Sequence, residues 1–283
     1  MAKILSGKEV VASLNEKLRA EAEDLKAAGV IPTLAIVRLG ERPDDISYER
    51  GAMKRAETVG VATKQFILPG QTSQQELLDL IQQINGDDAL HGLLLFRPLP
   101  SHIDEVAVRA AISPHKDVDG ITDLSLAGVF TGSGQGYPPC TAQACLETID
   151  HYGIELKGKR VVMIGRSLVV GKPLAMMLLA RHATLTICHT RTLDMPAICR
   201  QAEIVIAAAG KAKVVGGDFF APGQIVLDVG INVDEAGNLC GDADFAAAQE
   251  VVEAITPVPG GIGTVTTSVL LKHVIAAAGR KRG

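Results

Sequence analysis

The sequence has no tryptophan, and aromatic residues make up only 3% of its 283 positions. Its cysteines are few and odd in number, without any C-x-x-C pair, which argues against a disulfide framework or a zinc ribbon and fits a reducing compartment. We expect them to be buried free thiols. The five are Cys140, Cys145, Cys188, Cys199 and Cys240.

A strong excess of one charge is also lacking. The formal net charge is −4, with acidic and basic residues interspersed, which indicates neither a nucleic-acid nor a membrane partner. The amino terminus has no apolar core long enough for a signal peptide, and we expect no apolar stretch to reach the roughly 18 residues of a membrane helix. The seven histidines show no paired metal-ligand spacing, so no metal site is expected. These absences predict a cytoplasmic protein.

Apolar residues, by contrast, are abundant at 47%, and they alternate between strand-like and helical segments. In the amino-terminal half, strands are predicted at 33–39, 64–68 and 91–96, with helices from about 46 to 59 and about 74 to 86 between them. This order predicts βαβ units on a parallel sheet.

A second series of apolar runs begins near residue 160 and predicts a second parallel sheet. Its strands are expected at 160–164, 184–188, 203–208 and 224–229. The Gly/Pro-rich stretch 131–143 marks the expected seam between two α/β domains. We place the first domain at 1–140 and 264–283, and the second at 141–263.

A glycine loop connects the strand at 160–164 to the following helix in "VVMIGRSLVVGKPLA". Backbone N–H groups at the start of such a helix can bind a diphosphate. Gly165 permits a tight turn, Gly171 permits close approach of helix and strand, and the Ser167 hydroxyl can donate to a phosphate oxygen. A βα turn without any ligand has the same pattern, so this alternative stays open.

The end of the next strand indicates which dinucleotide the loop would bind. A carboxylate for a ribose 2′-hydroxyl is missing there, and the strand is followed by His189, Thr190 and Arg191. Arg191 can pair with a 2′-phosphate, which favours NADP and leaves NAD possible. An exposed arginine without a ligand is the alternative.

Several motifs in order resemble one family. The amino-terminal half contains, in order, "GLLLFRPLP", "SPHKDVDG" and "PPCTA". The second half contains the run from Gly158 to Thr192, then "VLDVGIN", "GD" at 241–242 and "TPVPGGIGTVT". Together they resemble methylenetetrahydrofolate dehydrogenase/methenyltetrahydrofolate cyclohydrolase over nearly the whole chain. The resemblance implies an N-terminal αβ catalytic domain, a Rossmann-like dinucleotide-binding domain, a C-terminal helix packing back on the first domain, an active site in the cleft between the domains, and a homodimer.

The resemblance also implies which residues bind the cofactor and the tetrahydrofolate one-carbon substrate. Asp119 would accept two N–H bonds from the pterin, and the Tyr48 ring would face the p-aminobenzoyl group. A loop aspartate making an Asx turn is the alternative for Asp119, and Asp117 fits that structural role better. The cofactor residues are Gly165, Arg166, Ser167, Thr190, Arg191 and Ile231; the substrate residues are Tyr48, Phe96, Asp119, Pro259, Gly260 and Gly261, with Tyr48 and Asp119 catalytic.

Two positions depart from the family pattern. The family has a lysine four residues after the tyrosine and a glutamine in the turn after the third strand; here these positions hold Ala52 and Phe96. Arg55 and Arg97 could reach the pocket, but a guanidinium does not give up its proton. Hydride transfer mainly needs alignment of the reacting carbons, whereas ring opening by water needs proton transfers.

We therefore expect an NADP-dependent methylenetetrahydrofolate dehydrogenase in which cyclohydrolase activity is weak or absent. The first alternative is the fully bifunctional enzyme, which forms 10-formyltetrahydrofolate. The second is another two-domain NADP-dependent oxidoreductase acting on a non-folate substrate, and the third is a folate-binding protein without catalytic activity.

Overall fold

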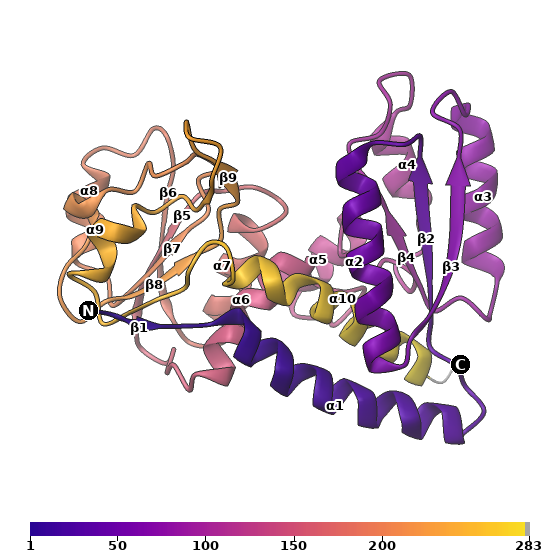
Figure 1. Ribbon diagram of the computed structural model, residues 1–283, viewed down its shortest axis with the longest axis horizontal. Helices are drawn as coiled ribbons and strands as arrows, with labels where there is room; N and C mark the ends of the chain where they lie inside the picture. The colour runs from indigo at the N-terminus through magenta and orange to yellow at the C-terminus, as the bar shows by residue number, and fades with distance from the viewer. Residues whose placement is uncertain (281–283) are drawn as a thin grey trace. The chain divides into compact units, whose positions relative to one another are not determined.

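The computed structural model describes residues 1–280 and divides into two compact units. The three-stranded unit comprises Ser13–Cys140 and Thr267–Gly283, and the six-stranded unit comprises Met1–Ala12 and Thr141–Thr266. Helices α1 (Gly7–Ala27) and α10 (Ile262–Gly279) each contribute residues to both units (Figure 1).

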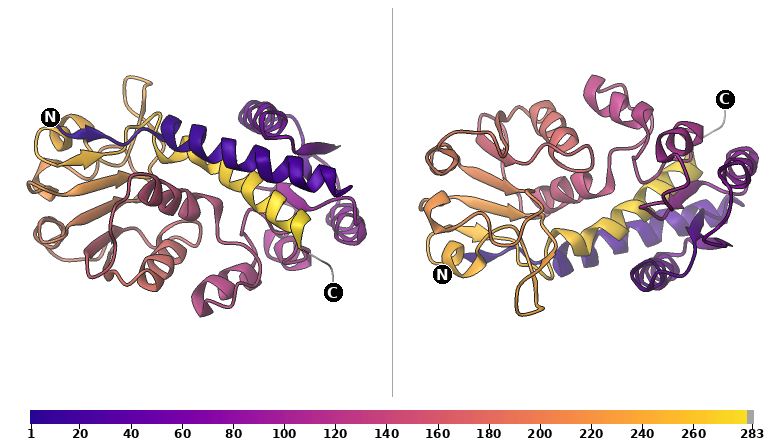
Figure 2. Two further views of the ribbon diagram at one scale, coloured as in Figure 1. Left: turned by 90° about the horizontal axis from the view of Figure 1, so that it is seen from below. Right: turned by 90° about the horizontal axis from the view of Figure 1, so that it is seen from above.

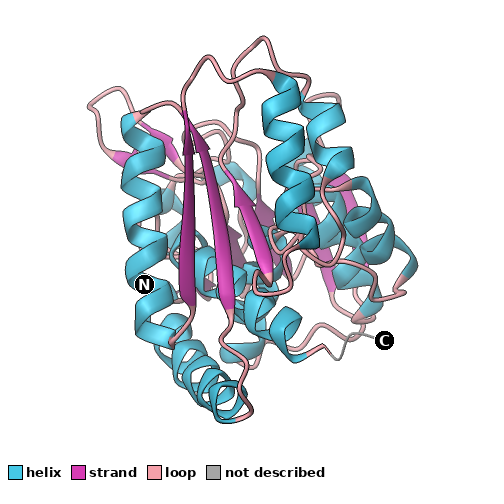
Figure 3. Ribbon diagram, turned by 90° about the vertical axis from the view of Figure 1, so that its right-hand side faces the viewer, coloured by secondary structure: helices cyan, strands magenta, loops and turns pink. Residues whose placement is uncertain are grey.

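The sheet of the three-stranded unit has the order β3-β2-β4, and all its strands are parallel (Figure 3). The strands are β2 (Thr33–Leu39), β3 (Ala62–Leu68) and β4 (Gly92–Leu95). Six of the seven β2 residues are buried, as expected for a central parallel strand covered on both faces. The three predicted strands are therefore confirmed to within two residues at each end.

Helix α2 (Pro43–Val59) begins earlier than the sequence predicted, because Pro43 is tolerated in the first turn, where the missing N–H has no intrahelical partner. It ends at Gly60, whose φ of +79° suits glycine. A capping box of Ser73 and Glu76 starts the next helix at Gln74, where the sequence predicts it. The other helices of this unit are α3 (Gln74–Gly86), α4 (Glu105–Ala111) and α5 (Asp123–Thr131).

Helix α10 corrects one expectation. With 18 residues and a mean hydropathy of 1.3, it is long and apolar enough to cross a membrane by those two measures. Half of it is buried, however, and the core helix of a globular protein meets the same test. The Ser268 hydroxyl donates to Asn15 Oδ1 at 2.9 Å, and His273 Nδ1 hydrogen-bonds to the Val118 carbonyl at 2.8 Å. The C-terminal helix thus packs on the N-terminal domain, as expected.

The six-stranded unit contains a parallel sheet of order β1-β11-β8-β7-β5-β6. Because β5 has β6 on one side and β7 on the other, the strand order reverses at β5. In doubly wound folds, ligands bind at the carboxyl ends of the strands where this reversal occurs. The strands are β1 (Lys3–Ile4), β5 (Arg160–Ile164), β6 (Thr184–Cys188), β7 (Ile204–Ala207), β8 (Ile225–Asp228) and β11 (Ala254–Ile255).

Helix α7 packs on β5 and β6, and α9 packs on β11. All five cysteines of the chain are free and buried, as predicted. The remaining elements of this unit are α6 (Cys140–His151), α7 (Gly171–Ala180), α8 (Met195–Arg200), the 3-10 helix η1 (Gly217–Phe219), α9 (Phe245–Gln249) and the antiparallel pair β9 (Asn232–Val233) and β10 (Leu239–Cys240).

The first 12 residues lie in a different unit from the one the sequence suggested. Strand β1 pairs with β11, with Lys3 opposite Ala254, so the chain begins at the edge of the six-stranded sheet (Figure 2). A two-residue strand shows no periodicity, and its partner lies about 250 residues away, so no local pattern could reveal this pairing.

Candidate active site

The carboxyl ends of β5, β6 and β7 surround a cavity of about 420 Å³, here called the Gly165 pocket. The loop after β5 contributes residues 164–167, the loop after β6 contributes His189 and Thr190, and the loop after β7 contributes Ala208 and Ala209. The opposite side is mainly apolar and comprises Met195, Val214, Val215 and Phe219.

Two glycines allow the backbone of this pocket to fold tightly. Gly165 has a φ of +120°, and a Cβ there would lie 2.1 Å from the Ala208 carbonyl oxygen. A Cβ on Gly171 would lie 2.3 Å from the Gly165 carbonyl oxygen. Only glycine fits at either position, so strand, loop and helix approach as a dinucleotide turn requires.

The Ser167 hydroxyl accepts hydrogen bonds from the backbone N–H groups of Val170 (3.1 Å) and Gly171 (3.4 Å). An accepting hydroxyl still has its own hydrogen to donate. Ser167 therefore stabilises the start of α7 and can also donate a hydrogen bond to an anion in the pocket.

The structure brings together four of the six predicted cofactor residues. Gly165, Arg166, Ser167 and Thr190 line the Gly165 pocket. Arg191 is exposed, and its backbone N–H donates to His189 Nδ1 at 3.1 Å. Ile231 is 65% exposed and lies after β8, next to Gly263, outside the pocket lining. The sequence did not identify the apolar side of the pocket, because its residues have no motif.

A pair of buried aspartates fixes the loops after β7 and β8. Asp242 accepts from the backbone N–H groups of Gly210 (3.0 Å) and Lys211 (2.9 Å). Asp228 accepts from three backbone N–H groups at 2.9–3.0 Å, those of Gly230, Asp242 and Ala243. Burial raises the pKa of Asp228 to about 6.

A second cavity, of about 380 Å³, lies in the three-stranded unit and is here called the Tyr48 pocket. It is lined by residues from the first turns of α2, by residues 94–97 at and after the end of β4, and by Asp119. The helix residues are Asp44, Asp45 and Tyr48, and Arg42 precedes the helix as its N-cap.

Tyr48 and Phe96 lie edge to face in this pocket, with their ring centroids 5.7 Å apart. Tyr48 is 42% exposed as a whole residue because it borders the pocket, but protein atoms crowd its hydroxyl and desolvate it. Burial by the surrounding protein raises the pKa of its hydroxyl to about 12, with smaller effects from a hydrogen bond to Thr267 and from the charge of Asp119. The hydroxyl is therefore protonated at neutral pH and can donate a hydrogen bond.

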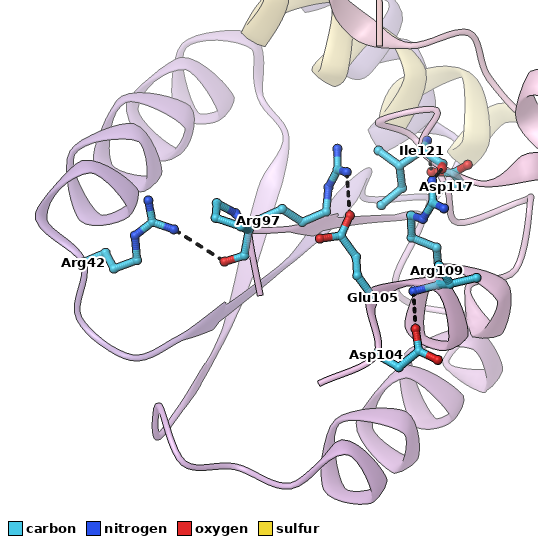
Figure 4. Close-up of polar contacts among 9 residues, drawn as sticks. Arg42, Arg97, Asp104, Glu105, Arg109, Asp117 and Ile121 are labelled. Atoms are coloured by element: carbon cyan, nitrogen blue, oxygen red, sulfur yellow. Dashed lines mark hydrogen bonds and ion pairs between the residues drawn. The ribbon is translucent and has the colours of Figure 1, made fainter. Parts of the chain in front are cut away.

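Asp119 also lines the Tyr48 pocket. Burial raises its pKa, the positive charge of Arg97 opposes that shift, and the nearby Asp117 adds to it. The Cys140 thiol also hydrogen-bonds to Asp119. Arg97 itself is paired with Glu105 at 3.1 Å (Figure 4). In a pocket that also contains a tyrosine, such a carboxylate can accept paired N–H groups from a flat heterocycle.

Asp117 has the structural role that the sequence suggested. It is 1% exposed, and its carboxylate accepts hydrogen bonds from the backbone N–H of Ile121 (2.9 Å) and from the hydroxyls of Thr122 and Ser125 (both 2.6 Å). It therefore closes the loop that holds Asp119.

A buried ion pair that the sequence did not predict holds α2 against the sheet. Arg38 on β2 and Glu49 on α2 are 6% and 3% exposed, and Arg38 Nε lies 2.7 Å from Glu49 Oε2. Gln65 on β3 donates to the other oxygen of Glu49. This network fixes the helix that bears Tyr48. Arg38 lies inside the apolar run 33–39, and this charged residue in a buried strand was the sequence feature that could have indicated an ion pair.

The two positions that depart from the family pattern are apolar and buried. Ala52 is 1% exposed and Phe96 is 9% exposed. Of the two arginines that could reach the site, Arg97 lines the Tyr48 pocket and Arg55 is not among the lining residues. The pocket thus keeps positive charge near Asp119 without a lysine.

The predicted residues Pro259, Gly260 and Gly261 lie in the six-stranded unit, in the loop between β11 and α10, and not in the unit of Tyr48 and Asp119. Gly260 has a φ of +103°, and its carbonyl accepts from the N–H of Gly7 at 2.8 Å. Within residues 1–280, no group of three or more His, Cys, Asp and Glu side chains is arranged to hold a metal ion.

Comparisons with known proteins match both halves of the chain to one family. Residues 5–119 match the tetrahydrofolate dehydrogenase/cyclohydrolase catalytic domain, and residues 139–282 match the NAD(P)-binding domain of the same family. The bifunctional protein FolD of Clostridioides difficile is 47% identical over 274 residues, covering 97% of this chain and 96% of that protein.

Two crystal structures are similar over 98% of this chain. The bifunctional FolD of Campylobacter jejuni has a TM-score of 0.95 at 37% identity, with 99% of its chain covered. The Trypanosoma brucei methylenetetrahydrofolate dehydrogenase-cyclohydrolase, solved with NADP cofactor and an inhibitor, has a TM-score of 0.90 at 34% identity, with 97% covered. With both domains matched and this similarity end to end, the chain belongs to the tetrahydrofolate dehydrogenase/cyclohydrolase family.

Proposed function

We propose that the protein oxidises 5,10-methylenetetrahydrofolate to 5,10-methenyltetrahydrofolate with NADP. The observation that supports this most directly is the Tyr48 pocket, in which an aromatic hydroxyl and the Asp119 carboxylate line one cavity. Asp119 would accept the 2-amino and ring N–H groups of the pterin, and Tyr48 would face the p-aminobenzoyl ring. Family membership favours this substrate over the non-folate alternative.

The Gly165 pocket fits NADP by its own geometry. Its loop has a glycine at which a side chain would collide with Ala208, so backbone can approach a diphosphate closely. Arg166 and Ser167 line the pocket, and the exposed Arg191 follows the lining residue Thr190, where it can pair with a 2′-phosphate. When bound, NADP supplies the hydride acceptor.

A second activity, hydrolysis of the methenyl product to 10-formyltetrahydrofolate, is favoured by the relatives. The proteins similar to this chain from Clostridioides difficile and Campylobacter jejuni are described as bifunctional. The comparisons thus support the fully bifunctional alternative better than the expectation of a weak or absent cyclohydrolase. We propose both activities, carried out by a homodimer, as the family resemblance implies, in the cytoplasm, as the composition predicts.

A spectrophotometric assay tests the proposal. Purified protein is mixed with 5,10-methylenetetrahydrofolate and either NADP or NAD, and reduced cofactor and methenyl product are followed together. Formation of reduced cofactor with a lower KM for NADP is expected. Separately supplied methenyltetrahydrofolate measures hydrolysis. Lack of any cofactor reduction, with a well-folded protein, would refute the dehydrogenase assignment. Light scattering measures the oligomeric state.

A further inference from the structure

We propose that Asp45 is the proton-transfer residue of the hydrolytic reaction. The inference deepens the proposed bifunctional activity and rests on it. Hydrolysis needs a group that takes a proton from water and returns one to a departing nitrogen. The apolar side chains of Ala52 and Phe96 cannot supply it, so the group must come from another position in the Tyr48 pocket.

Asp45 lies on the same face of α2 as Tyr48. Residues three apart on an α-helix point about 60° from each other, so Asp45 is one turn before Tyr48 on that face. Ala52 is one turn after it. Both Asp45 and Tyr48 line the pocket, and Asp45 is only 8% exposed, although it lies in the first turn of a helix, where most acidic residues face solvent.

The other polar groups of the pocket are unsuited to the task. Arg42 and Arg97 stay protonated in proteins and can contribute charge but cannot act as a base. Tyr48 has its pKa raised to about 12 by burial, so it holds its proton at neutral pH. Asp119 is assigned to the pterin. Asp44 also lines the pocket four residues before Tyr48, but its side chain is exposed, so bulk water competes for its proton, whereas Asp45 is buried.

Asp45 forms a long ion pair with the residue that caps its own helix. Its ion-pair partner is Arg42, whose Nε lies 3.8 Å from Asp45 Oδ2. That separation exceeds a hydrogen-bond distance, so the pair leaves the carboxylate able to bind water. Arg42 is in turn directed toward the Pro98 carbonyl, to which its NH1 donates at 3.4 Å (Figure 4).

The reaction can be written with Asp45 as the only acid–base group. Water attacks the methenyl carbon, forming a C–O bond while the C=N π electrons move to nitrogen, and the Asp45 carboxylate takes one water proton. In the second step the C–N5 bond breaks with its electron pair going to N5, which receives the proton from Asp45. The hydroxyl proton leaves to solvent as the C=O bond forms. The net products are 10-formyltetrahydrofolate and one proton.

The test compares Asp45→Asn with the parent protein in both assays. We expect kcat for hydrolysis to fall by about 10²–10⁴-fold, far more than the rate of oxidation falls or the KM for methenyltetrahydrofolate rises. Asp45→Glu should recover part of the lost rate. Glu57→Gln, which removes an exposed carboxylate from the last turn of the same helix, is the matched control and should hydrolyse at the parent rate.

Chemical rescue separates catalysis from a structural role. In Asp45→Gly, added formate should restore hydrolysis in proportion to its concentration while leaving oxidation unchanged. Three results would overturn the inference: parent-like hydrolysis by Asp45→Asn, equal loss of oxidation and hydrolysis without formate rescue, or an oxidising parent protein with no measurable hydrolysis. If the parent fails to oxidise methylenetetrahydrofolate, the dehydrogenase proposal fails independently.

Discussion

Replacing Gly165 by alanine should weaken NADP binding strongly while leaving most of the fold intact. The new Cβ would lie 2.1 Å from the Ala208 carbonyl oxygen, at least 1.3 Å inside the 3.4 Å at which ordinary van der Waals contact begins. The Ala208 N–H donates to Ile164 at 2.8 Å, so the clash acts directly on the pairing of β5 with β7. The ends of the two strands must separate where the diphosphate is proposed to bind.

The size of the effect follows from this displacement. A misplacement of about 1 Å at a binding or catalytic site can cost on the order of 10²-fold. An alanine at a φ of +120° adds backbone strain of about 1–3 kcal/mol. We therefore expect the Kd for NADP to rise by about 100-fold and the free energy of unfolding to fall by a few kcal/mol.

Calorimetric titration with NADP and urea unfolding measure the two quantities separately. Gly237→Ala is the matched control, because Gly237 also has a positive φ, +82°, but nothing lies within 4 Å of the added Cβ. It should lose about 1–2 kcal/mol of stability and bind NADP as the parent does. An unchanged Kd in Gly165→Ala would show that the Gly165 pocket is not the cofactor site.

Three further results are expected. Asp228→Asn removes one of two oxygens that accept three backbone N–H groups, so urea unfolding should show a loss of about 2–4 kcal/mol. The folded-state pKa of Asp228 is raised to about 6, so the folded state binds the proton more tightly than the unfolded state does. The free energy of unfolding of the parent should therefore fall as pH rises from about 4 to 6, and the variant should lack this slope. Arg191→Gln should raise the Kd for NADP about tenfold or more and that for NAD little, measured by parallel titrations, whereas equal changes would contradict a 2′-phosphate contact. Ala52→Lys combined with Phe96→Gln should raise hydrolysis relative to oxidation in the paired assays, and a larger gain in oxidation would count against the assignment of proton transfer to the Tyr48 face.

The central strands could be predicted from the sequence because parallel strands covered on both faces are continuous apolar runs. Strands β2, β5 and β6 have the predicted bounds. The two-residue strands β1 and β11 could not be predicted, since they are too short for a periodic pattern and pair across almost the whole chain.

The Gly165 loop was predictable because its chemistry depends on backbone: a strand, a glycine that tolerates positive φ and the start of a helix are all visible in order along the chain. In "KDVDG", the sequence predicted a structural role for Asp117 and a substrate-binding role for Asp119. The hydrogen bonds of Asp117 confirm the first of these predictions. The Arg38–Glu49 pair was missed because side-chain pairing between a strand and a helix depends on tertiary packing.

Asp45 shows why a site can be incompletely visible in sequence. Asp44 and Asp45 are adjacent acidic residues in the first turn of a helix, where carboxylates are common because they stabilise the helix dipole. Adjacent residues on a helix point about 100° apart, and only packing decides which of the two faces protein. Here Asp44 is exposed and Asp45 is 8% exposed at the edge of the Tyr48 pocket. On this face of α2, Ala52 lies one turn after Tyr48 and has no polar group, whereas Asp45 lies one turn before Tyr48 and has a carboxylate. An apolar residue at one position therefore does not imply that the face lacks a group for proton transfer.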